Sequence, residues 1–379
     1  MEGAFPSDKI ASSQWNFTVG QGAKVFDHLQ KLPKKLGDEA RIWQGMVTGA
    51  DKVFVVEKLD DSRRELISVR DSNGETHDLE RPILRRFLKD VSLWPFSFVE
   101  GSHYLVFPYA VTDKGATLLT PKEMKSTFPM AWRFLNSKRK ILIEREGGTW
   151  DHDQWYAFGR SQNLTQMEGD KLVVQVIAQS PRFSFDSGNY YFTGGGNGPY
   201  YGVRWINPDE KRSLHYLQAV LNSRIADYFI RSISTPFRGG YWSYGKRFIE
   251  QIPMMPCSPI QEALLLQIVL QLLWLTRHFV DHGADQSARD PLMLAYFEQI
   301  LNGMVYELYF PEEVNGAGLH LFDLVEQAAL PALETIPETK RLTTLRPLFE
   351  ALYDGTHPLK ISLQKLQTLD TVRIIEGKA

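Results

Sequence analysis

The sequence has 379 residues, of which 43% are hydrophobic and 23% charged, and this composition excludes a chain that is mainly disordered. The 43 Lys and Arg residues nearly balance the 45 Asp and Glu residues, so the total charge shows no tail for binding a polyanion. The single cysteine, Cys257, excludes a disulfide framework and a cysteine-based zinc site.

The charge is distributed unevenly along the chain. Residues 1–130 have a net charge of 0, residues 131–256 sum to +5, and residues 257–379 sum to −7. Because a basic surface attracts an anionic partner, we expect such a partner to bind the middle third.

Signals for export or membrane insertion are weak. The first residues, Met1-Glu2-Gly3, lack the basic and apolar regions of a signal peptide. The most apolar run, Leu264–Leu275, is too short to cross a bilayer and contains Gln267 and Gln271. We therefore expect a cytoplasmic protein without a membrane partner.

The first two thirds of the chain contain short strand patterns. β-branched and aromatic runs at 53–56, 66–69 and 104–107 are bounded by Asp, Asn, Gly or Pro, which is typical of strands. Another strand is predicted over 171–177, among loops rich in glycine and aromatic residues. One helix is predicted from Pro208 to about Ile233, with Asn207 as its N-cap.

The last third has a helical pattern. Ser258-Pro259-Ile260-Gln261 is a capping box that predicts the start of a helix. Asp290-Pro291 predicts the start of another, which Pro311 should end. Two further helical stretches are expected, at 321–335 and 338–353.

The change of pattern near residue 257 predicts a domain boundary. The fold class expected is a mixed α/β domain followed by an all-α helical domain. The expected division is an N-terminal extension over 1–14, the α/β domain over 15–256 and the helical domain over 257–379.

Known catalytic motifs are incomplete in this sequence. Gly194–Gly198 lacks the Gly-Lys-Ser/Thr ending of a phosphate-binding loop, and Asp151-His152-Asp153 cannot all face one ion from a loop. Two Glu-x-Lys runs, at 123–125 and 338–340, match half of a nuclease site but fall in predicted helices after proline. We therefore predict no catalytic, cofactor-binding or metal site on this chain.

The middle region instead offers polar, basic and aromatic residues on loops. Arg, Gln and Asn can read guanine and adenine edges, Lys suits phosphates, and aromatic rings can stack on bases. The alternative, a solvated rim around an ordinary core, stays open from composition alone. The candidate DNA contacts are Arg160, Gln162, Asn163, Arg182, Arg238, Tyr241, Lys246 and Arg247.

The order of several motifs carries a family resemblance. The segment Gly45-Met46-Val47-Thr48-Gly49-Ala50-Asp51-Lys52-Val53-Phe54 resembles the opening of the specificity region in TaqI-like adenine DNA methyltransferases, a family that includes type IIG restriction–modification enzymes. Similar pieces follow in the family's order and extend the resemblance over about 40–310. They lie at 82–88, 104–109, 155–164, 171, 217–223, 249–253 and 305–309.

The resemblance implies a DNA target-recognition domain over about 15–256, packed on the helical domain. In such a system a methyltransferase unit flips adenine out of the duplex and methylates it, while the specificity domain reads the flanking bases. The implied partners are double-stranded DNA and a methyltransferase domain or subunit, which would also hold the S-adenosylmethionine. Gly45, Thr48, Gly49 and Asn222-Ser223 are expected to shape the fold.

The sequence departs from the family at the catalytic motif. Family members carry an N-terminal methyltransferase domain with a catalytic Asn-Pro-Pro-Tyr, whereas here Asn207-Pro208 is followed by Asp209-Glu210. With no room for that domain before residue 40, we expect this chain alone to transfer no methyl group and to bind no S-adenosylmethionine. Whether it is a split subunit or part of a longer enzyme stays open.

Two other functions remain as alternatives. One is a nuclease or other hydrolase whose acidic site the sequence does not reveal. The other is a protein-interaction scaffold that uses the acidic helical tail as its docking surface.

Overall fold

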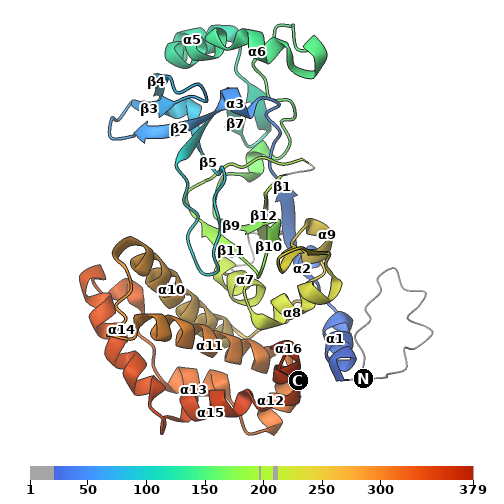
Figure 1. The fold of residues 1–379 in the computed structure, drawn as a ribbon, viewed down its shortest axis with the longest axis vertical. Helices are drawn as coiled ribbons and strands as arrows, with labels where there is room; N and C mark the ends of the chain where they lie inside the picture. The colour runs from blue at the N-terminus through green and yellow to red at the C-terminus, as the bar shows by residue number, and fades with distance from the viewer. Residues whose placement is uncertain (1–20, 196–197, 208–211, 379) are drawn as a thin grey trace, which may run out of the picture.

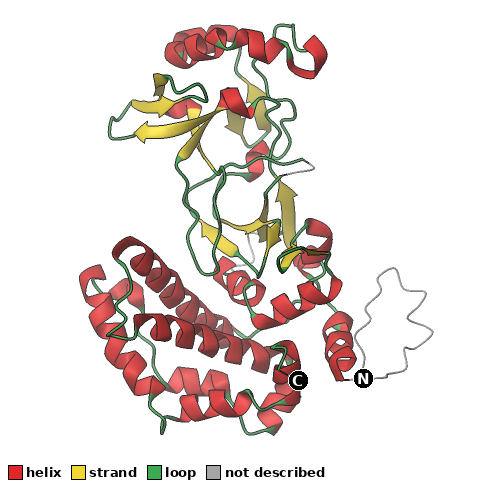
Figure 2. Cartoon of the chain, in the orientation of Figure 1, coloured by secondary structure: helices red, strands yellow, loops and turns green. Residues whose placement is uncertain are grey.

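A computed structural model describes residues 21–195, 198–207 and 212–378 (Figure 1). The molecule is elongated, with sheets and short helices at one end and a purely helical part at the other (Figure 2). Every described element after residue 257 is helical, so the expectation of an α/β part followed by an α-helical part is confirmed. The predicted extension over 1–14 lies outside the described residues.

A four-stranded antiparallel sheet forms the middle of the molecule. Its strand order is β1-β12-β9-β11, and the central strand β9 is buried along most of its length. Since β1 pairs with β12, an early segment of the chain joins a strand more than 150 residues later. The bounds are β1 Ala40–Gln44, β12 Tyr200–Trp205, β9 Lys171–Gln175 and β11 Phe183–Asp186.

A five-stranded antiparallel sheet lies farther from the helical part (Figure 1). It confirms the strands predicted at 66–69 and 104–107. The strand predicted at 53–56 begins only at Val55, because the Thr48 side chain bonds to the Ala50 amide and winds the chain into the short helix α3, Asp51–Phe54. In spatial order the strands are β4 Thr76–Glu80, β3 Leu66–Arg70, β2 Val55–Asp60, β6 His103–Val106 and β5 Leu84–Phe87.

Two small sheets complete the β structure. The strand predicted over 171–177 is broken after Gln175. The Val176 amide still bonds to Pro199 in register with β12, but proline has no N–H to donate in return, and the Val176 carbonyl accepts from the Tyr244 amide instead. The chain then forms β10 in a separate sheet of order β10-β14-β13. The remaining bounds are β10 Ile177–Ala178, β14 Tyr241–Ser243, β13 Pro236–Phe237, β7 Tyr109–Thr112 and β8 Gly115–Leu118.

The single helix predicted over 208–233 is wrong, because the structure has two helices there. Ser213 caps α7 through its hydroxyl, and Ser223 caps α8 in the same way. The break is stabilised by Asn222, whose side chain bonds to both the amide and the carbonyl of Phe183. The helices are α7 Leu214–Leu221 and α8 Arg224–Ile233, while residues 208–211 lie outside the described residues.

Six short helices of the described chain, α1, α2, α4, α5, α6 and α9, lie around the sheets of the α/β part. Helix α5 packs against β4 and α2 lies beside β1, whereas α1 packs against α8 and α16, and α9 packs against α8. The bounds are α1 Gln21–Lys31, α2 Leu36–Glu39, α4 Pro121–Thr127, α5 Pro129–Ser137, α6 Arg139–Ile143 and α9 Lys246–Ile249.

The helical part begins with the predicted capping box. Ser258 and Gln261 exchange side-chain and main-chain hydrogen bonds at the start of α10. As predicted, the helix from Asp290 stops before Pro311, which itself opens the next helix. The bounds are α10 Pro259–His282, α11 Asp290–Tyr309, α12 Pro311–Gly316, α13 Leu321–Gln327, α14 Glu338–Tyr353, α15 Pro358–Leu366 and α16 Asp370–Ile375.

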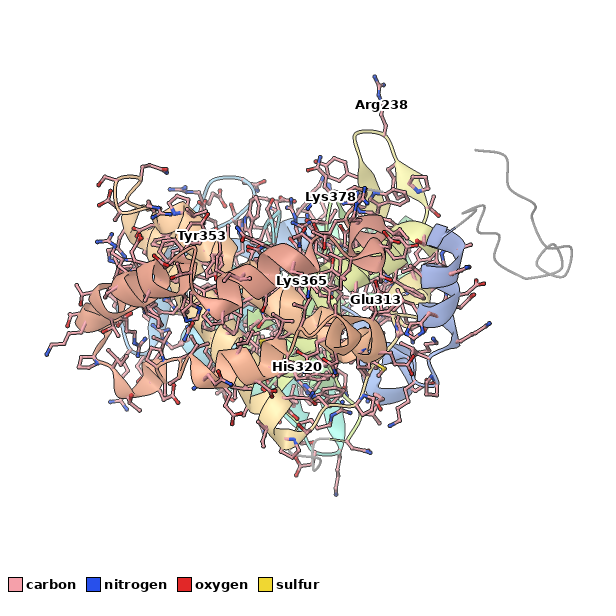
Figure 3. All side chains as sticks on the ribbon, turned by 90° about the horizontal axis from the view of Figure 1, so that it is seen from below. Arg238, Glu313, His320, Tyr353, Lys365 and Lys378 are labelled. Atoms are coloured by element: carbon pink, nitrogen blue, oxygen red, sulfur yellow. The ribbon has the colours of Figure 1, made fainter. Side chains whose placement is uncertain are left out.

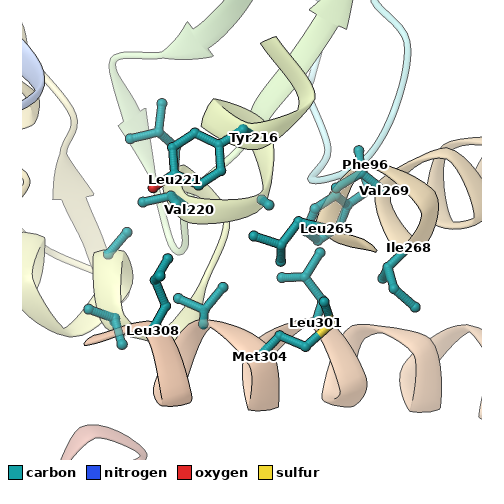
Figure 4. Packing of buried hydrophobic residues seen from close by; sticks show 14 of the residues in the cluster. Phe96, Tyr216, Val220, Leu221, Leu265, Ile268, Val269, Leu301, Met304 and Leu308 are labelled. Carbon is teal, nitrogen blue, oxygen red and sulfur yellow. The ribbon is translucent and has the colours of Figure 1, made fainter. Parts of the chain in front are cut away.

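One apolar core crosses the boundary near residue 257. In Figure 4, Tyr216 and Val220 of α7 lie beside Leu265 of α10 and Met304 of α11. Of the described helices, α10 alone is long and apolar enough to cross a membrane by length and composition, and half of its apolar window is buried. Its packing against α7 and α11 accounts for that apolar character.

Candidate nucleic-acid interface

A groove opens beside β1, on the side where the four-stranded sheet meets α9. Its volume is about 840 Å³. Three candidate residues from the sequence, Gln162, Asn163 and Lys246, line it together. Sequence analysis missed three polar lining residues on β1 and β12, because nothing in a strand pattern marks a side chain that lines a groove: Arg41, Gln44 and Tyr201.

The side chains of Gln162 and Asn163 are fixed by the main chain of β1. Gln162 Nε2 donates to the Gly45 carbonyl at 3.1 Å, and Asn163 Nδ2 donates to the Gln44 carbonyl at 2.9 Å. Asn163 has a φ of 58°, a left-handed conformation that asparagine tolerates better than most residues. Each amide keeps an oxygen and a second N–H that these bonds do not use.

The Gly45–Gly49 turn holds the segment that contains Gln162 and Asn163 against the end of β1. Val47 and Arg160 form an antiparallel bridge with main-chain N–O distances of 3.1 and 2.8 Å. A Cβ atom on Gly45 would lie 1.7 Å from the Phe192 carbonyl oxygen, so only glycine fits there. The expectation that this motif shapes the fold is confirmed by this geometry.

A buried arginine that the sequence did not single out holds the same turn. The Arg145 guanidinium donates to the carbonyls of Thr48 at 3.0 Å, Ala157 at 2.9 Å and Trp155 at 2.6 Å. Burial lowers the pKa of Arg145, and these acceptors replace the water it has lost. Because its acceptors are main-chain carbonyls, no side-chain motif could have revealed it.

The groove has a basic rim. Arg41 and Lys246 are both exposed, and neither forms an ion pair with the described residues. Among the residues that the structure describes, Glu250 is the single acidic residue that lines the groove. Arg247 follows Lys246 on α9, where its exposed guanidinium lies 4.5 Å from the Phe248 ring. The rim therefore suits an anionic ligand.

Arg238 and Tyr241 lie on the β13–β14 hairpin, outside the groove lining. Two glycines in left-handed conformations, Gly239 and Gly240, form the turn. Arg238 projects from its tip away from the body of the protein (Figure 3). Tyr241 pairs with Phe237 across the hairpin, and the two rings are 40% and 44% exposed.

Arg182 lies apart from the groove and is half-buried. Its guanidinium carbon is 4.5 Å from the Trp94 ring centroid, and Nη1 donates to the Leu93 carbonyl at 3.4 Å. These contacts hold the loop that contains Trp94 against β11. The geometry favours a packing role over a base contact.

One group of side chains has the composition of a metal site. Asp71, Glu75 and His77 lie together around the β3–β4 turn. Lys138 Nζ, however, lies 2.6 Å from Asp71 Oδ2 and 3.3 Å from Glu75 Oε2, so an ammonium already neutralises the carboxylates. In the described chain, Asp151-His152-Asp153 is exposed and belongs to no such group.

The chain has sequence homology to type II restriction enzymes and methyltransferases. Over 243 residues it is 23% identical to the type II restriction enzyme and methyltransferase RM.Eco57I of Escherichia coli, a match that covers 61% of this chain and 24% of that protein. Over 226 residues it is 22% identical to the type II methyltransferase M.PaeR7I of Pseudomonas aeruginosa, covering 58% and 33% respectively. The matches thus span a quarter to a third of these curated relatives.

Solved structures also show a likeness to this chain. The type IIL restriction–modification enzyme MmeI, solved in complex with DNA, aligns with 84% of this chain and 36% of its own chain, at 11% identity and a TM-score of 0.45. No protein-family model matches the sequence.

Proposed function

We propose that this chain is the DNA-recognition part of a type II restriction–modification system and works beside an adenine-specific methyltransferase unit. The homology to type II enzymes supports the system, and the groove beside β1 supports the role in recognition. The single observation that carries the proposal is the meeting of Gln162, Asn163 and Lys246 with Arg41 in that groove.

The residue types divide into positioning and reading groups. Arg41 and Lys246, as exposed cations on the rim, hold phosphates and set the register of the duplex. Gln162 and Gln44 are held by hydrogen bonds, to Gly45 and Tyr201, that orient their amides before DNA arrives. Pre-oriented amides are suited to adenine's major-groove edge, where one group donates and one accepts.

Methyl transfer belongs to the partner unit in this proposal. The catalytic tetrapeptide of the resembling family does not fit here, because Asn207-Pro208 continues as Asp209-Glu210. S-adenosylmethionine is therefore proposed on the methyltransferase unit, and no step of the reaction is assigned to this chain. Calorimetric titration of the cofactor into the purified protein should show no saturable binding.

The proposal is tested by DNA binding across a salt series. Fluorescence anisotropy with a mixed-sequence duplex should give roughly micromolar binding that weakens steeply with salt, since each neutralised phosphate contributes about 0.9 to the log–log slope. Arg41→Ala and Lys246→Ala should each reduce the slope by about one. Lys340→Ala, an exposed lysine on α14, is the matched control and should change nothing.

The result also separates the alternatives. Affinity that does not respond to salt would argue against a phosphate-holding groove and favour the protein scaffold. Metal-dependent cleavage of the duplex by the purified chain would instead favour the nuclease. Among the described residues, the one group with the composition of a metal site is Asp71, Glu75 and His77. Its carboxylates are already paired with Lys138, so this group gives the nuclease alternative no support.

A further inference from the structure

A second basic surface lies on helices α4, α5 and α6, at the end of the molecule opposite the helical part (Figure 1). From Pro121 to Ile143 the chain has six Lys and Arg residues against one acidic residue, Glu123. Glu123 is engaged in the capping box at Thr120. The surface consists of the exposed cations Lys122, Lys125, Arg133, Arg139 and Lys140, here called the arm surface.

The charges of the arm surface are not neutralised by neighbours. None of its five cations forms an ion pair within the residues that the structure describes. The sixth cation of this segment, Lys138, is different because it is buried and bound to Asp71 and Glu75. The arm surface therefore keeps its full positive charge toward solvent.

Aromatic contacts place two of these cations on one surface. Lys125 Nζ lies 5.7 Å from the Trp132 ring, and Arg139 lies 5.4 Å from the Trp155 ring. The two indole rings are themselves 5.6 Å apart, between centroids. Lys125 and Arg139 thus flank a single Trp pair, which limits how far either cation can move.

The arm surface is rigidly attached to the five-stranded sheet. The carboxylate of Glu80, at the end of β4, accepts from the amides of Met130 and Ala131 at 2.7 and 2.9 Å. This places an anion at the N-terminus of α5, where it stabilises the helix. Phe134 and Leu135 of α5 are buried beneath, so the exposed face is fixed in orientation.

The same segment also leads to the groove. Trp155, which contacts Arg139, is followed after a few residues by Gln162 in the groove lining. Arg145, just after α6, bonds to both the Trp155 carbonyl and the Thr48 carbonyl. The arm surface and the Gly45–Gly49 turn are therefore parts of one hydrogen-bonded framework.

We propose that the arm surface binds the phosphate backbone of the same duplex that the groove reads, beside the recognised bases. The inference rests on the proposed function of the groove. A duplex presents regularly spaced negative charges, which match several exposed cations that form no ion pair within the described residues. An acidic protein segment is less favoured because the one carboxylate of α4–α6, Glu123, is engaged in the capping box and cannot fix its register.

The test removes three charges and keeps a polar, flexible side chain at each position. The variant is Lys125→Gln, Arg133→Gln and Lys140→Gln, and the probe is the mixed-sequence duplex across a salt series. The log–log slope should fall by roughly 0.9 for each phosphate that is no longer neutralised, about 2 to 3 in all. The control variant, Lys340→Gln, Lys365→Gln and Arg373→Gln, removes the same charges from the helical part and should keep the slope.

The possible results distinguish the two proposals. If the wild-type protein binds the duplex and the arm variant keeps its slope, the arm surface serves another partner and this inference is overturned alone. If the wild-type protein does not bind, the proposed function and this inference both fail. A melting curve of each variant must match the wild type, so that weaker binding cannot be due to unfolding.

Discussion

Lys171 Nζ lies 2.6 Å from Asp186 Oδ2, and both side chains are completely buried. The two residues are also register partners in the β9–β11 pair. Asp186 accepts further hydrogen bonds from the amides of Gly188 at 2.7 Å and Tyr190 at 3.0 Å. The carboxylate therefore links the four-stranded sheet to the turn that follows β11.

Removing one member of this ion pair should be strongly destabilising. Asp186→Ala leaves a buried ammonium without its counter-ion and two amides without acceptors, so we expect a loss of about 3–5 kcal/mol in the free energy of unfolding, measured with urea. Glu57→Ala is the control, because its pair with Arg70 is 45–47% exposed and should contribute at most about 1 kcal/mol. Equal losses for the two variants would contradict this.

The Asp71 carboxylate should make stability depend on pH. Burial alone would raise the pKa of Asp71, but hydrogen bonds from Lys138, the Glu75 amide and His77 hold it at about 2. A carboxyl group whose pKa is lowered in the folded state stabilises the fold at pH values above its ordinary pKa of 3.8. This contribution is lost as the pH falls toward 2, the pKa in the folded state.

Asp71→Asn is the variant that measures this contribution. It should cost about 2 kcal/mol near neutral pH, from a shift of nearly two pKa units, and almost nothing near pH 2. Chemical unfolding across pH 2 to 7, roughly the span of the effect, gives the difference. The exposed Asp113→Asn should show no such convergence, since it has no partner among the described residues. A constant difference at every pH would show that Asp71 acts through shape alone.

Gly45 should accept no larger residue. Gly45→Ala places a Cβ atom 1.7 Å from a main-chain oxygen, and backbone cannot move away as a flexible side chain can. We expect a cost of about 3 kcal/mol or more, seen as a lower melting temperature. Gly316→Ala meets nothing within 4 Å and should leave the melting temperature nearly unchanged.

Asn163 and Gln162 should respond differently to alanine. Asn163 is half-buried in a left-handed conformation, so Asn163→Ala should lower stability by roughly 1–3 kcal/mol. Gln162 is exposed, so Gln162→Ala should instead relax the base preference at one position, at a cost of about 1–3 kcal/mol on the preferred site. Melting curves and selection from a randomised duplex, with the methyltransferase partner present, measure the two effects. A Gln162 variant with lower stability and unchanged preference would assign it to the scaffold.

The sequence predicted those elements whose signal is local. The capping box at Ser258 and the strand at 66–69 follow from hydrogen-bonding groups and alternation within a few residues. The break between α7 and α8 could not be predicted in this way, because Asn222 ends the helix by bonding to Phe183, 39 residues away. Tertiary interactions overrode a regular apolar spacing.

The candidate site, too, was predicted only where the signal is local. Gln162, Asn163 and Lys246 were found from residue type, and the structure brings them together. Arg41 was missed because a lone arginine in a strand has no distinguishing pattern. The arm surface was missed because its cations straddle residue 130, where the charge count was divided.

The core shared by α7, α10 and α11 has a consequence for exchanging parts between relatives. A cut at residue 257 would expose Leu265 and Leu301, which are fully buried, and would leave Tyr216 without its apolar neighbours from α10 and α11. A chimaera that takes only the sheets from one parent would therefore need both parents to match along this apolar seam. Chimaeras that carry residues 21 to 378 as one block avoid that mismatch. We therefore expect specificity to transfer between relatives when the sheets and the helical part are exchanged together.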